Sequence, residues 1–228
     1  MRSNNHVLLT VAILALAVLS CQAVTNLTGG GATATVPPQT TDNVILVDDF
    51  TSTNWGTGTD ADSSIEYANE TLQMIVFTKN WFVWSTPNDE NYENVHMEVT
   101  AINNDTDPTT AFGIMCQQQE VDDSFYYFAI TPAGQYAIAE TSSTASDVFL
   151  TNDNQWQYSD NIPRNAESYR IGADCGNGEL TLYVNDQQVD SVADDTYSNG
   201  GVALFVWSGE DVASANISFD DFLMTRLP

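Results

Sequence analysis

From Asp42 onward the sequence repeats one pattern, in which short runs of β-branched and aromatic residues are separated by clusters of Asn, Asp, Gly, Ser and Pro. Many of these runs alternate apolar and polar residues, and a period of two is typical of half-buried β-strands. No segment shows the 3.6-residue period of an amphipathic helix. The pattern predicts strands over 44–50, 65–67, 71–77, 82–85, 95–102, 110–118, 125–131, 135–140, 168–175, 179–184, 187–192, 201–206 and 217–225.

Several joins between these runs carry hairpin signals. Asn185-Asp186 is short enough for a two-residue turn, and 132–134 and 176–178 each contain glycine between two aromatic or aliphatic runs. Roughly a dozen short strands with turns every 8 to 12 residues indicate an all-β sandwich or barrel. About 185 residues are ample for a single core.

The first twenty residues differ from the rest. An apolar run of about 13 residues follows Arg2, whereas a membrane-spanning helix needs about 20. The size and flanks of this run predict a signal peptide over 1–20. Val18-Leu19-Ser20 before Cys21 resembles the lipobox of bacterial lipoproteins, in which the cysteine is acylated and becomes the N-terminus. The alternative is ordinary signal cleavage near Ala23, which would remove Cys21.

Residues 21–41 contain no charged side chain and are rich in Thr, Gly, Ala, Pro and Gln, which predicts a flexible linker. The folded domain is then expected over 42–228. Together these segments predict an exported protein that is anchored by lipid to a membrane, on its extracytoplasmic face or at the cell surface. The anchor is its only expected contact with a membrane.

The charge balance excludes one class of partner. The 228 residues include 31 Asp and Glu but only 5 Lys and Arg, a formal net charge of −26. Binding to nucleic acid requires clustered bases that displace counterions, so no nucleic-acid role is expected. The hydrophobic share of 43% also excludes an acidic disordered chain.

Three cysteines leave one unpaired in an exported protein unless one of them has another role. If Cys21 takes lipid, Cys116 and Cys175 remain as a pair in an oxidising compartment, where a disulfide is favoured. The alternative is two buried free thiols, which pack as small hydrophobic side chains.

The two ends of the predicted domain look alike, with the sequences 47–50 and 219–222 both containing Asp-Asp-Phe. Such similarity is expected when the first and last strands pair side by side. Antiparallel pairing would bring carboxylates together, and Asp49 and Asp220 could then share a structural calcium ion, which prefers several oxygen ligands. The alternative is that these residues end their strands in solvent. No other cofactor is expected.

Seven sequence blocks resemble the concanavalin A-like lectin/glucanase superfamily, in its laminin-G-like and 3-keto-disaccharide-hydrolase-type branch. They are 46–50, 111–116, 123–130, 134–136, 169–175, 180–185 and 219–222. The resemblance implies a two-sheet antiparallel jelly-roll sandwich, and the paired cysteines of that family match Cys116 and Cys175. It says less about function, because this fold hosts lectins, glycosidases, adhesion modules and spacers.

Catalytic machinery is not visible. The glucanases of this superfamily carry their two carboxylates as Glu-x-Asp-x-Glu on one strand, and this spacing is missing here; Glu120, Asp122 and Asp123 lie in a predicted turn. His96 stands alone on a predicted strand and is expected to be exposed and neutral, so no nucleophile triad is expected. The sequence therefore assigns no catalytic residue, and a glycoside hydrolase-like enzyme ranks third among the functional hypotheses, after the two given below.

Binding has better support, because aromatic rings offer flat faces on which sugar rings stack. In the resembled fold the concave sheet face is the usual glycan site. Trp207 falls in step with Ala203 and Phe205, opposite Val202 and Leu204, which indicates a strand that is apolar on both faces. The candidate ligand-binding residues are Trp81, Trp84, Tyr126, Tyr136, Trp156 and Trp207.

These residues favour a non-catalytic, lectin-like carbohydrate-binding module at the cell surface, with a glycan as its ligand. The alternative is a structural or adhesion domain in which the same aromatics belong to the core or to subunit contacts. Trp55 is expected to close one end of the sandwich as a core residue and is not a binding candidate.

Overall fold

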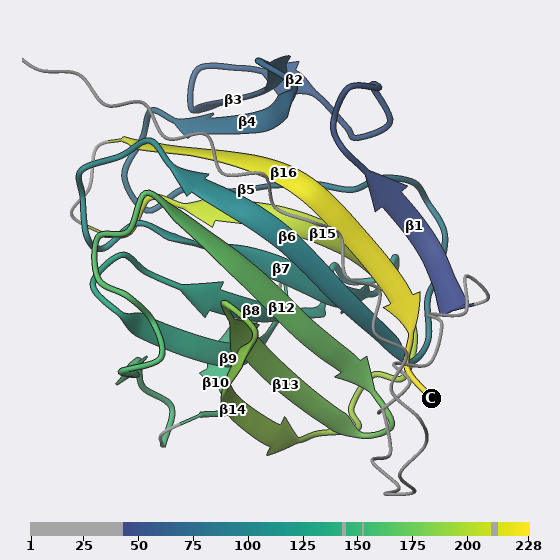
Figure 1. Ribbon diagram of the computed structural model, residues 1–228. Coiled ribbons are helices and arrows are strands. Elements are labelled where there is room, and N and C mark those ends of the chain that lie inside the picture. The colour runs from purple at the N-terminus through teal and green to yellow at the C-terminus, as the bar shows by residue number, and fades with distance from the viewer. Residues whose placement is uncertain (1–42, 143–144, 152, 211–213) are drawn as a thin grey trace, which may run out of the picture. The chain divides into compact units, whose positions relative to one another are not determined.

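The computed structural model describes residues 43–142, 145–151, 153–210 and 214–228 (Figure 1). The predicted signal peptide over 1–20, the linker over 21–41 and the lipid-acceptor Cys21 lie outside these residues. The described residues belong to one compact unit, Thr40–Pro228. None of them forms a helix of the length and apolar character needed to cross a membrane.

The strands form two antiparallel sheets, which confirms the predicted jelly-roll sandwich. Sheet A contains, in spatial order, β14 (Gln187–Ala193), β13 (Glu179–Val184), β12 (Ser168–Gly176), β6 (Val95–Asn103), β16 (Ala215–Arg226), β4 (Thr71–Val76), β3 (Ser63–Ala68) and β2 (Gly58–Thr59), with β1 (Val44–Asp48) also paired to β16. Sheet B contains β10 (Ala145–Phe149), β9 (Gln135–Ser142), β8 (Phe125–Ile130), β7 (Ala111–Gln118), β15 (Gly201–Trp207) and β5 (Phe82–Ser85), with β11 (Gln157–Tyr158) paired to β9.

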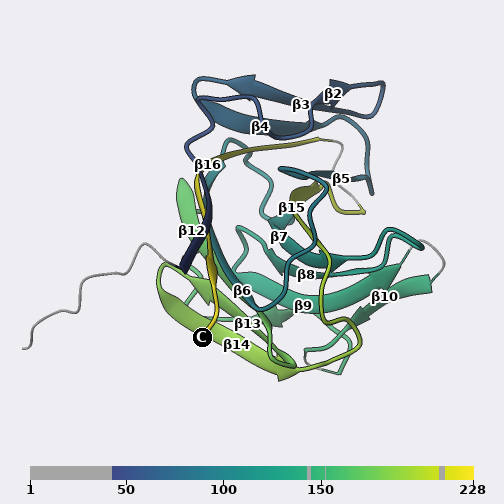
Figure 2. The same ribbon diagram turned by 90° about the vertical axis from the view of Figure 1, so that its right-hand side faces the viewer.

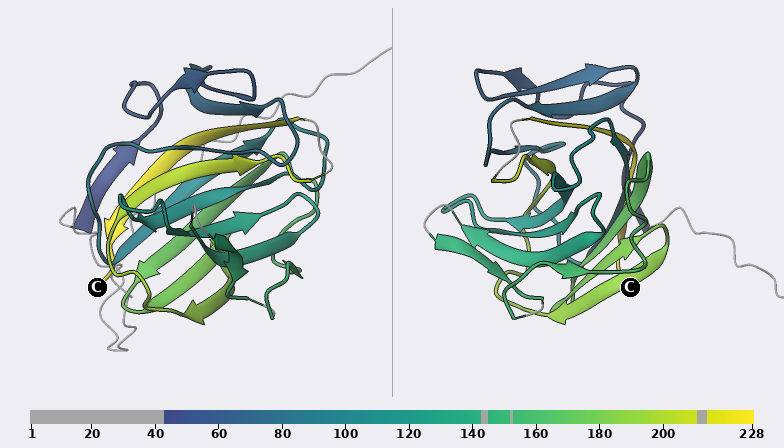
Figure 3. Two further views of the ribbon diagram at one scale, coloured as in Figure 1. Left: turned by 180° about the vertical axis from the view of Figure 1, so that it is seen from behind. Right: turned by 90° about the vertical axis from the view of Figure 1, so that its left-hand side faces the viewer.

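The chain crosses repeatedly between the sheets, so the centre of each sheet joins distant segments. β16 lies beside β6 in sheet A, and β15 lies between β5 and β7 in sheet B. Figure 2 shows that sheet B is curved and that its hollow side faces away from sheet A. Seen from behind in the left panel of Figure 3, β15, β7, β8 and β9 face the viewer.

The core lies between the sheets and follows the predicted alternation. In β4, Leu72, Met74 and Val76 are buried while the residues between them are half-buried. β6 repeats this pattern over nine residues. β7, β8 and β15 are instead buried at almost every position, so both of their faces are covered by apolar side chains. The second covered face lies on the hollow side of sheet B.

Turn geometry agrees with the hairpin signals. Asn185 and Asp186 both have positive φ, at 50° and 62°, as a two-residue type I′ turn requires. Asn177 and Gly178 form the corresponding turn between β12 and β13, with φ of 56° and 73°. These turns set the register of the three strands at one end of sheet A.

Cys116 on β7 and Cys175 on β12 form a disulfide, as predicted, with their Cα atoms 6.6 Å apart. Because β7 belongs to sheet B and β12 to sheet A, the bond joins the two sheets through the core. Both cysteines are completely buried. The disulfide therefore fixes the position of sheet B, which carries the candidate site, relative to sheet A.

The two similar ends of the domain lie side by side, because β1 pairs with β16 and Asp48 lies opposite Phe222. Trp55 is buried here, as predicted, with its ring centroid 5.5 Å from that of Phe50 and 5.1 Å from that of Phe222. The indole Nε1 of Trp55 donates a hydrogen bond to Oδ2 of Asp48 at 3.2 Å. The buried Asp48 carboxylate thus anchors this end of the sandwich.

Candidate functional site

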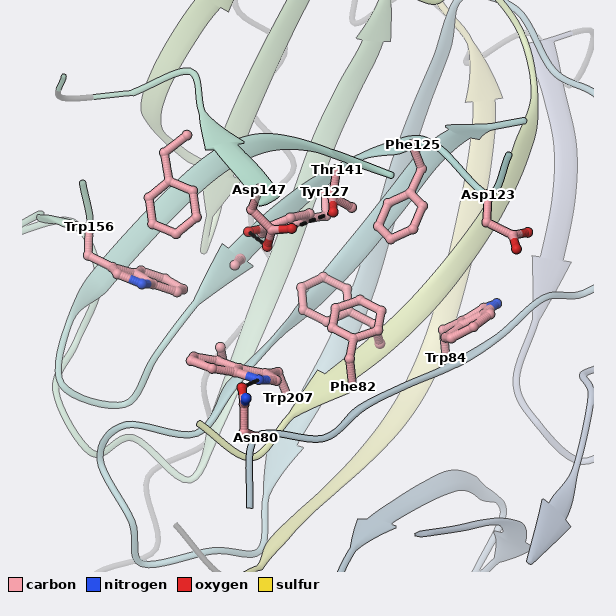
Figure 4. Close-up of a pocket in the computed structure, with 14 residues that line it drawn as sticks. Asn80, Phe82, Trp84, Asp123, Phe125, Tyr127, Thr141, Asp147, Trp156 and Trp207 are labelled. Atoms are coloured by element: carbon pink, nitrogen blue, oxygen red, sulfur yellow. Dashed lines mark hydrogen bonds between the residues drawn. The ribbon is translucent and has the colours of Figure 1, made fainter. Parts of the chain in front are cut away.

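A groove of about 380 Å³ crosses the hollow face of sheet B. The floor of the groove is formed by every second residue of the strands, because successive side chains point to opposite faces of a sheet. On β15, Val202 and Leu204 belong to the main core, while Ala203 and Phe205 belong to a separate apolar cluster on the groove side. The groove is lined by Asn80, Phe82, Trp84, Ala111, Asp123, Phe125, Tyr127, Ala129, Thr141, Asp147, Phe149, Trp156, Phe205 and Trp207 (Figure 4).

Aromatic rings contact one another along the whole groove. The ring centroid of Phe82 lies 6.0 Å from that of Trp84 and 6.4 Å from that of Tyr127. Phe149 continues the series, 6.5 Å from Tyr127 and 5.4 Å from Trp156. The groove is therefore a continuous aromatic surface from Trp84 to Trp156, not a set of isolated exposed rings.

The floor beneath these rings is closely packed. Phe82 stacks on Phe205 with centroids 4.9 Å apart and planes within 15°. A Cβ at Gly113 would lie 1.9 Å from the carbonyl oxygen of Phe128 and 3.3 Å from the Phe205 ring, so only glycine allows β8 and Phe205 to approach β7 this closely. Phe205 itself is 1% exposed and supports the rings above it.

Three tryptophans stand at the edges of the groove. Trp84 is 42% exposed, and Trp156 and Trp207 are half-buried. Trp207 Nε1 donates a hydrogen bond to Oδ1 of Asn80 at 3.2 Å, which holds the indole in place. Figure 4 shows Trp156 and Trp84 at opposite ends of the groove with Phe82 and Trp207 between them. The arrangement offers several ring faces to one elongated ligand.

Polar groups lie along one edge. Tyr127 donates a hydrogen bond from its hydroxyl to Oδ2 of Asp147 at 2.8 Å, and the hydroxyl of Thr141 donates to the other oxygen of the same carboxylate. Burial, together with the neighbouring Asp147 carboxylate, raises the pKa of the Tyr127 hydroxyl far above its usual value. Tyr127 therefore stays a neutral donor, and Asp147 is held at the groove as an exposed acceptor.

The structure brings three of the predicted binding residues together, since Trp84, Trp156 and Trp207 all line the groove. Trp81 is 39% exposed but does not line it. The strand period separates Trp81 from Trp84, because Phe82 and Trp84 share the groove face of β5 while Val83 points into the core.

Tyr126 and Tyr136 do not belong to the site, and their prediction as ligand-binding residues is corrected here. They are 0% and 3% exposed and are part of the main core. Their hydroxyls reach the edge of sheet A at β14, where Tyr126 bonds Asp194, just after the strand, and Tyr136 donates to Oδ2 of Asp190 on the strand at 2.9 Å. These rings face the inner side of sheet B, where no ligand can stack on them.

Sequence reasoning missed the phenylalanines that build the floor. Phe125 and Tyr127 alternate with Tyr126 on β8, and Phe205 alternates with Leu204 on β15. The signal in the sequence is a strand with apolar residues at both phases, and β8 carries it as clearly as β15. Phe82, Phe149, Asn80, Asp123, Thr141 and Asp147 were also missed.

Asp49 and Asp220, the two residues of the predicted calcium site, each accept hydrogen bonds from within their own segment. Oδ1 of Asp49 accepts hydrogen bonds from the backbone N and the hydroxyl of Thr51, at 3.1 and 2.6 Å. Oδ1 of Asp220 accepts one from the backbone N of Asp221 at 2.8 Å. Over the described ranges, three or more His, Cys, Asp or Glu side chains nowhere gather as they would to hold a metal ion.

A charged cluster on the outer face of sheet A corrects the expectation that His96 is isolated. Nδ1 of His96 lies 2.5 Å from Oδ1 of Asp174, and Nε2 lies 2.9 Å from Oε1 of Glu98. Arg170 donates to the other oxygen of Glu98 at 2.9 Å, and Tyr183 donates to Asp174 at 2.8 Å. The hydrogen bond to Asp174 raises the pKa of His96, although partial burial opposes it.

The sequence matches no protein-family model and no curated protein. Solved structures do match. A carbohydrate binding module from Bacillus subtilis aligns with a TM-score of 0.59 and 14% identity, covering 76% of this chain and 96% of that chain. A Bacillus subtilis protein of unknown function with a galectin-like fold gives a TM-score of 0.60 at 10% identity, covering 81% and 96%.

The β-glucanase of Bacillus licheniformis is a third similar structure, with a TM-score of 0.53, 9% identity and coverage of 80% of this chain and 98% of that chain. At these identities the likeness defines the fold. The chain folds as a concanavalin A-like jelly-roll sandwich whose hollow sheet face carries an aromatic groove.

Proposed function

We propose that this chain is a non-catalytic carbohydrate-binding module that holds an elongated glycan on the hollow face of sheet B. The observation that carries the proposal is the unbroken aromatic surface from Trp84 to Trp156. Carbohydrate rings have apolar C–H faces that stack on such rings, and Asp147 and Asn80, on opposite sides of the groove, supply hydrogen-bond acceptors for hydroxyls (Figure 4). The similar carbohydrate binding module from Bacillus subtilis adds support.

The charged groups of the groove favour binding over hydrolysis. A retaining glycosidase needs two carboxylates about 5–5.5 Å apart on either side of the scissile bond. Among the residues that line the groove, the carboxylates are Asp123, in the turn before β8, and Asp147, on the edge strand β10. Asp147 already accepts hydrogen bonds from Tyr127 and Thr141, and the central strands present apolar side chains.

A glycan array probed with the intact protein tests this function. We expect binding to at least one family of glycans, with the signal lost in a variant that lacks the groove tryptophans. The array is run with calcium and with a chelator, so that any need for an ion is measured directly. Failure to bind in both conditions would contradict the proposal and favour a structural or adhesion domain.

We propose in addition that the module is tethered to the outer side of a bacterial membrane through lipid on Cys21. The support is the apolar run of 1–20 and the lipobox-like Val18-Leu19-Ser20 before the cysteine. Cells that express the chain and are fed an alkyne-labelled fatty acid should incorporate label into the protein, and Cys21→Ser should abolish it. Equal labelling of both forms, or secretion of the unsubstituted chain into the medium, would contradict the anchor.

A further inference from the structure

The aromatic groove continues beyond Trp84 into a second hollow. This hollow, of about 500 Å³, shares Trp84 and Asp123 with the groove, so the two are adjacent. Its other walls come from the segment after β5 and from the turn between β7 and β8, and they include Asn88, Gln118 and Glu120. A ligand longer than the aromatic surface would pass over Trp84 into this polar end.

The charges along this path have one sign. Asp123 and Asp147 line the groove, and Asp89, Glu90 and Glu120 join Asp123 in the second hollow. All five side chains are exposed. Among the described residues that line either hollow there is no Lys, Arg or His.

The bases in the described part of the chain lie outside both hollows. Arg170 is paired with Glu98 on the outer face of sheet A, and Arg164 lies over the ring of Tyr158. Lys79 precedes Asn80 in the chain but is not among the lining residues. The net charge of −26 adds a negative field around the whole protein. An approaching anionic ligand therefore meets repulsion at long range and again inside the site.

We propose that this arrangement makes the site selective by charge, so that it accepts chains of uncharged sugars and rejects glycans that carry carboxylate or sulfate groups. The inference rests on the proposed function and adds the class of glycan. Carbohydrate stacking on aromatic rings does not itself distinguish neutral from acidic sugars, because both present C–H faces. The carboxylates supply the discrimination by repelling the wrong ligand.

If charge repulsion causes the selectivity, the affinity for anionic chains should depend on salt concentration. At 0.15 M salt the Debye length is about 8 Å, and at 1 M it falls to about 3 Å, so repulsion between solvent-exposed charges weakens as salt increases. A neutral chain has no such dependence. We expect an anionic chain to bind about 10- to 100-fold more weakly than its neutral parent at low salt, with the difference shrinking at high salt.

The test uses matched polysaccharides and the intact protein. Laminarin, barley mixed-linkage β-glucan and inulin are each compared with their carboxymethylated forms, and with hydroxyethylated forms as uncharged controls of similar bulk. Affinity is measured by calorimetry or affinity electrophoresis at 20 mM and 500 mM NaCl. The double variant Asp123→Asn with Asp147→Asn removes the two groove carboxylates, and Glu66→Gln on the exposed face of β3 removes one charge far from the groove.

We expect the hydroxyethylated form to bind with the affinity of its parent. The difference in affinity between the parent and the carboxymethylated form should become smaller in high salt and in the double variant, but not in Glu66→Gln. Carboxymethylated chains that bind as tightly as their parents would overturn the charge selectivity while leaving the glycan-binding function intact. A gap unchanged by salt and by the double variant would also overturn it. If only carboxymethylated chains bind, the charge selectivity is overturned and the glycan-binding function stands. If neither the neutral nor the charged chains bind, the proposed function fails, and this inference fails with it.

Discussion

Replacing Trp84 with alanine tests the aromatic groove most directly. Trp84 is 42% exposed at the junction of the groove and the second hollow. With an aromatic side-chain area of about 250 Å², about 100 Å² of Trp84 is open to a ligand. At about 25 cal/mol per Å², covering one ring face, or about half of this area, stabilises the complex by about 1.3 kcal/mol, and covering all of it by about 2.5 kcal/mol.

These free energies correspond to a loss of about 10- to 70-fold in affinity for Trp84→Ala. Isothermal titration with a glycan identified on the array would measure it. Trp81→Ala is the matched control, because Trp81 is 39% exposed, lies three residues away and does not line the groove. Both variants should unfold at nearly the temperature of the unsubstituted protein, since neither ring belongs to the core.

The reasoning would be refuted if Trp81→Ala weakened binding as much as Trp84→Ala. It would also be refuted if Trp84→Ala bound like the unsubstituted protein while the glycan still bound elsewhere.

Three further predictions concern the scaffold. Replacing Cys116 and Cys175 together by alanine should lower the free energy of unfolding by about 4 kcal/mol, the chain-entropy value for the 59-residue separation, as measured by denaturant titration. Asp48→Ala should cost about 2–4 kcal/mol, because it leaves the buried indole N–H of Trp55 and a backbone N–H without an acceptor, again measured by denaturant titration. The pKa of His96 is raised in the folded state, so the stability that it contributes is fully present below its ordinary value of about 6.5 and is lost as the pH rises through the folded-state pKa, as thermal unfolding at a series of pH values would show.

Each of these three scaffold predictions has its own control. The unsubstituted protein in excess reductant should lose the same stability as the double cysteine variant. Asp49→Ala removes an exposed neighbour of Asp48 and should change stability by less than about 0.5 kcal/mol. His96→Gln should flatten the decline in stability above pH 6.5, and an undiminished decline in that variant would show that another group is responsible.

For most strands the sequence shows which face is buried, because only one of the two alternating sets of residues is apolar. In β6 the apolar residues Val95, Met97 and Val99 alternate with the polar residues between them, so the inner face is unambiguous. β8 reads Phe-Tyr-Tyr-Phe-Ala-Ile, apolar at both phases, and the sequence alone does not tell which set faces the core. The register with β7 and β9 decides this, and it places Tyr126 inside and Tyr127 outside. The errors at Tyr126 and Tyr136 have this origin.

Other parts of the site could not be predicted because they depend on pairing between strands that are distant in the sequence. β10 is a short edge strand that includes Ser146 and Asp147, and it has too little apolar alternation to be predicted. Its position beside β9 brings Asp147 to Tyr127, twenty residues earlier in the chain. Asp48 is one of two consecutive acids at the end of β1, yet the fold buries it against Trp55. Such partners are chosen by tertiary contacts that a strand pattern does not contain.

The groove consists of a packed aromatic floor and polar residues at its edges, and these two parts have different roles. The floor rings already pack on one another, as Phe82 does on Phe205, so their rotamers are fixed before a ligand arrives and binding loses little side-chain entropy. The disulfide to sheet A fixes the sheet that carries them. The groups that would set specificity, Asp123, Asp147 and Asn80, instead come from a turn, an edge strand and a loop. Substitutions at these edges can therefore change which glycan is accepted without disturbing the aromatic floor, whereas substitutions in the floor should weaken binding to every glycan alike.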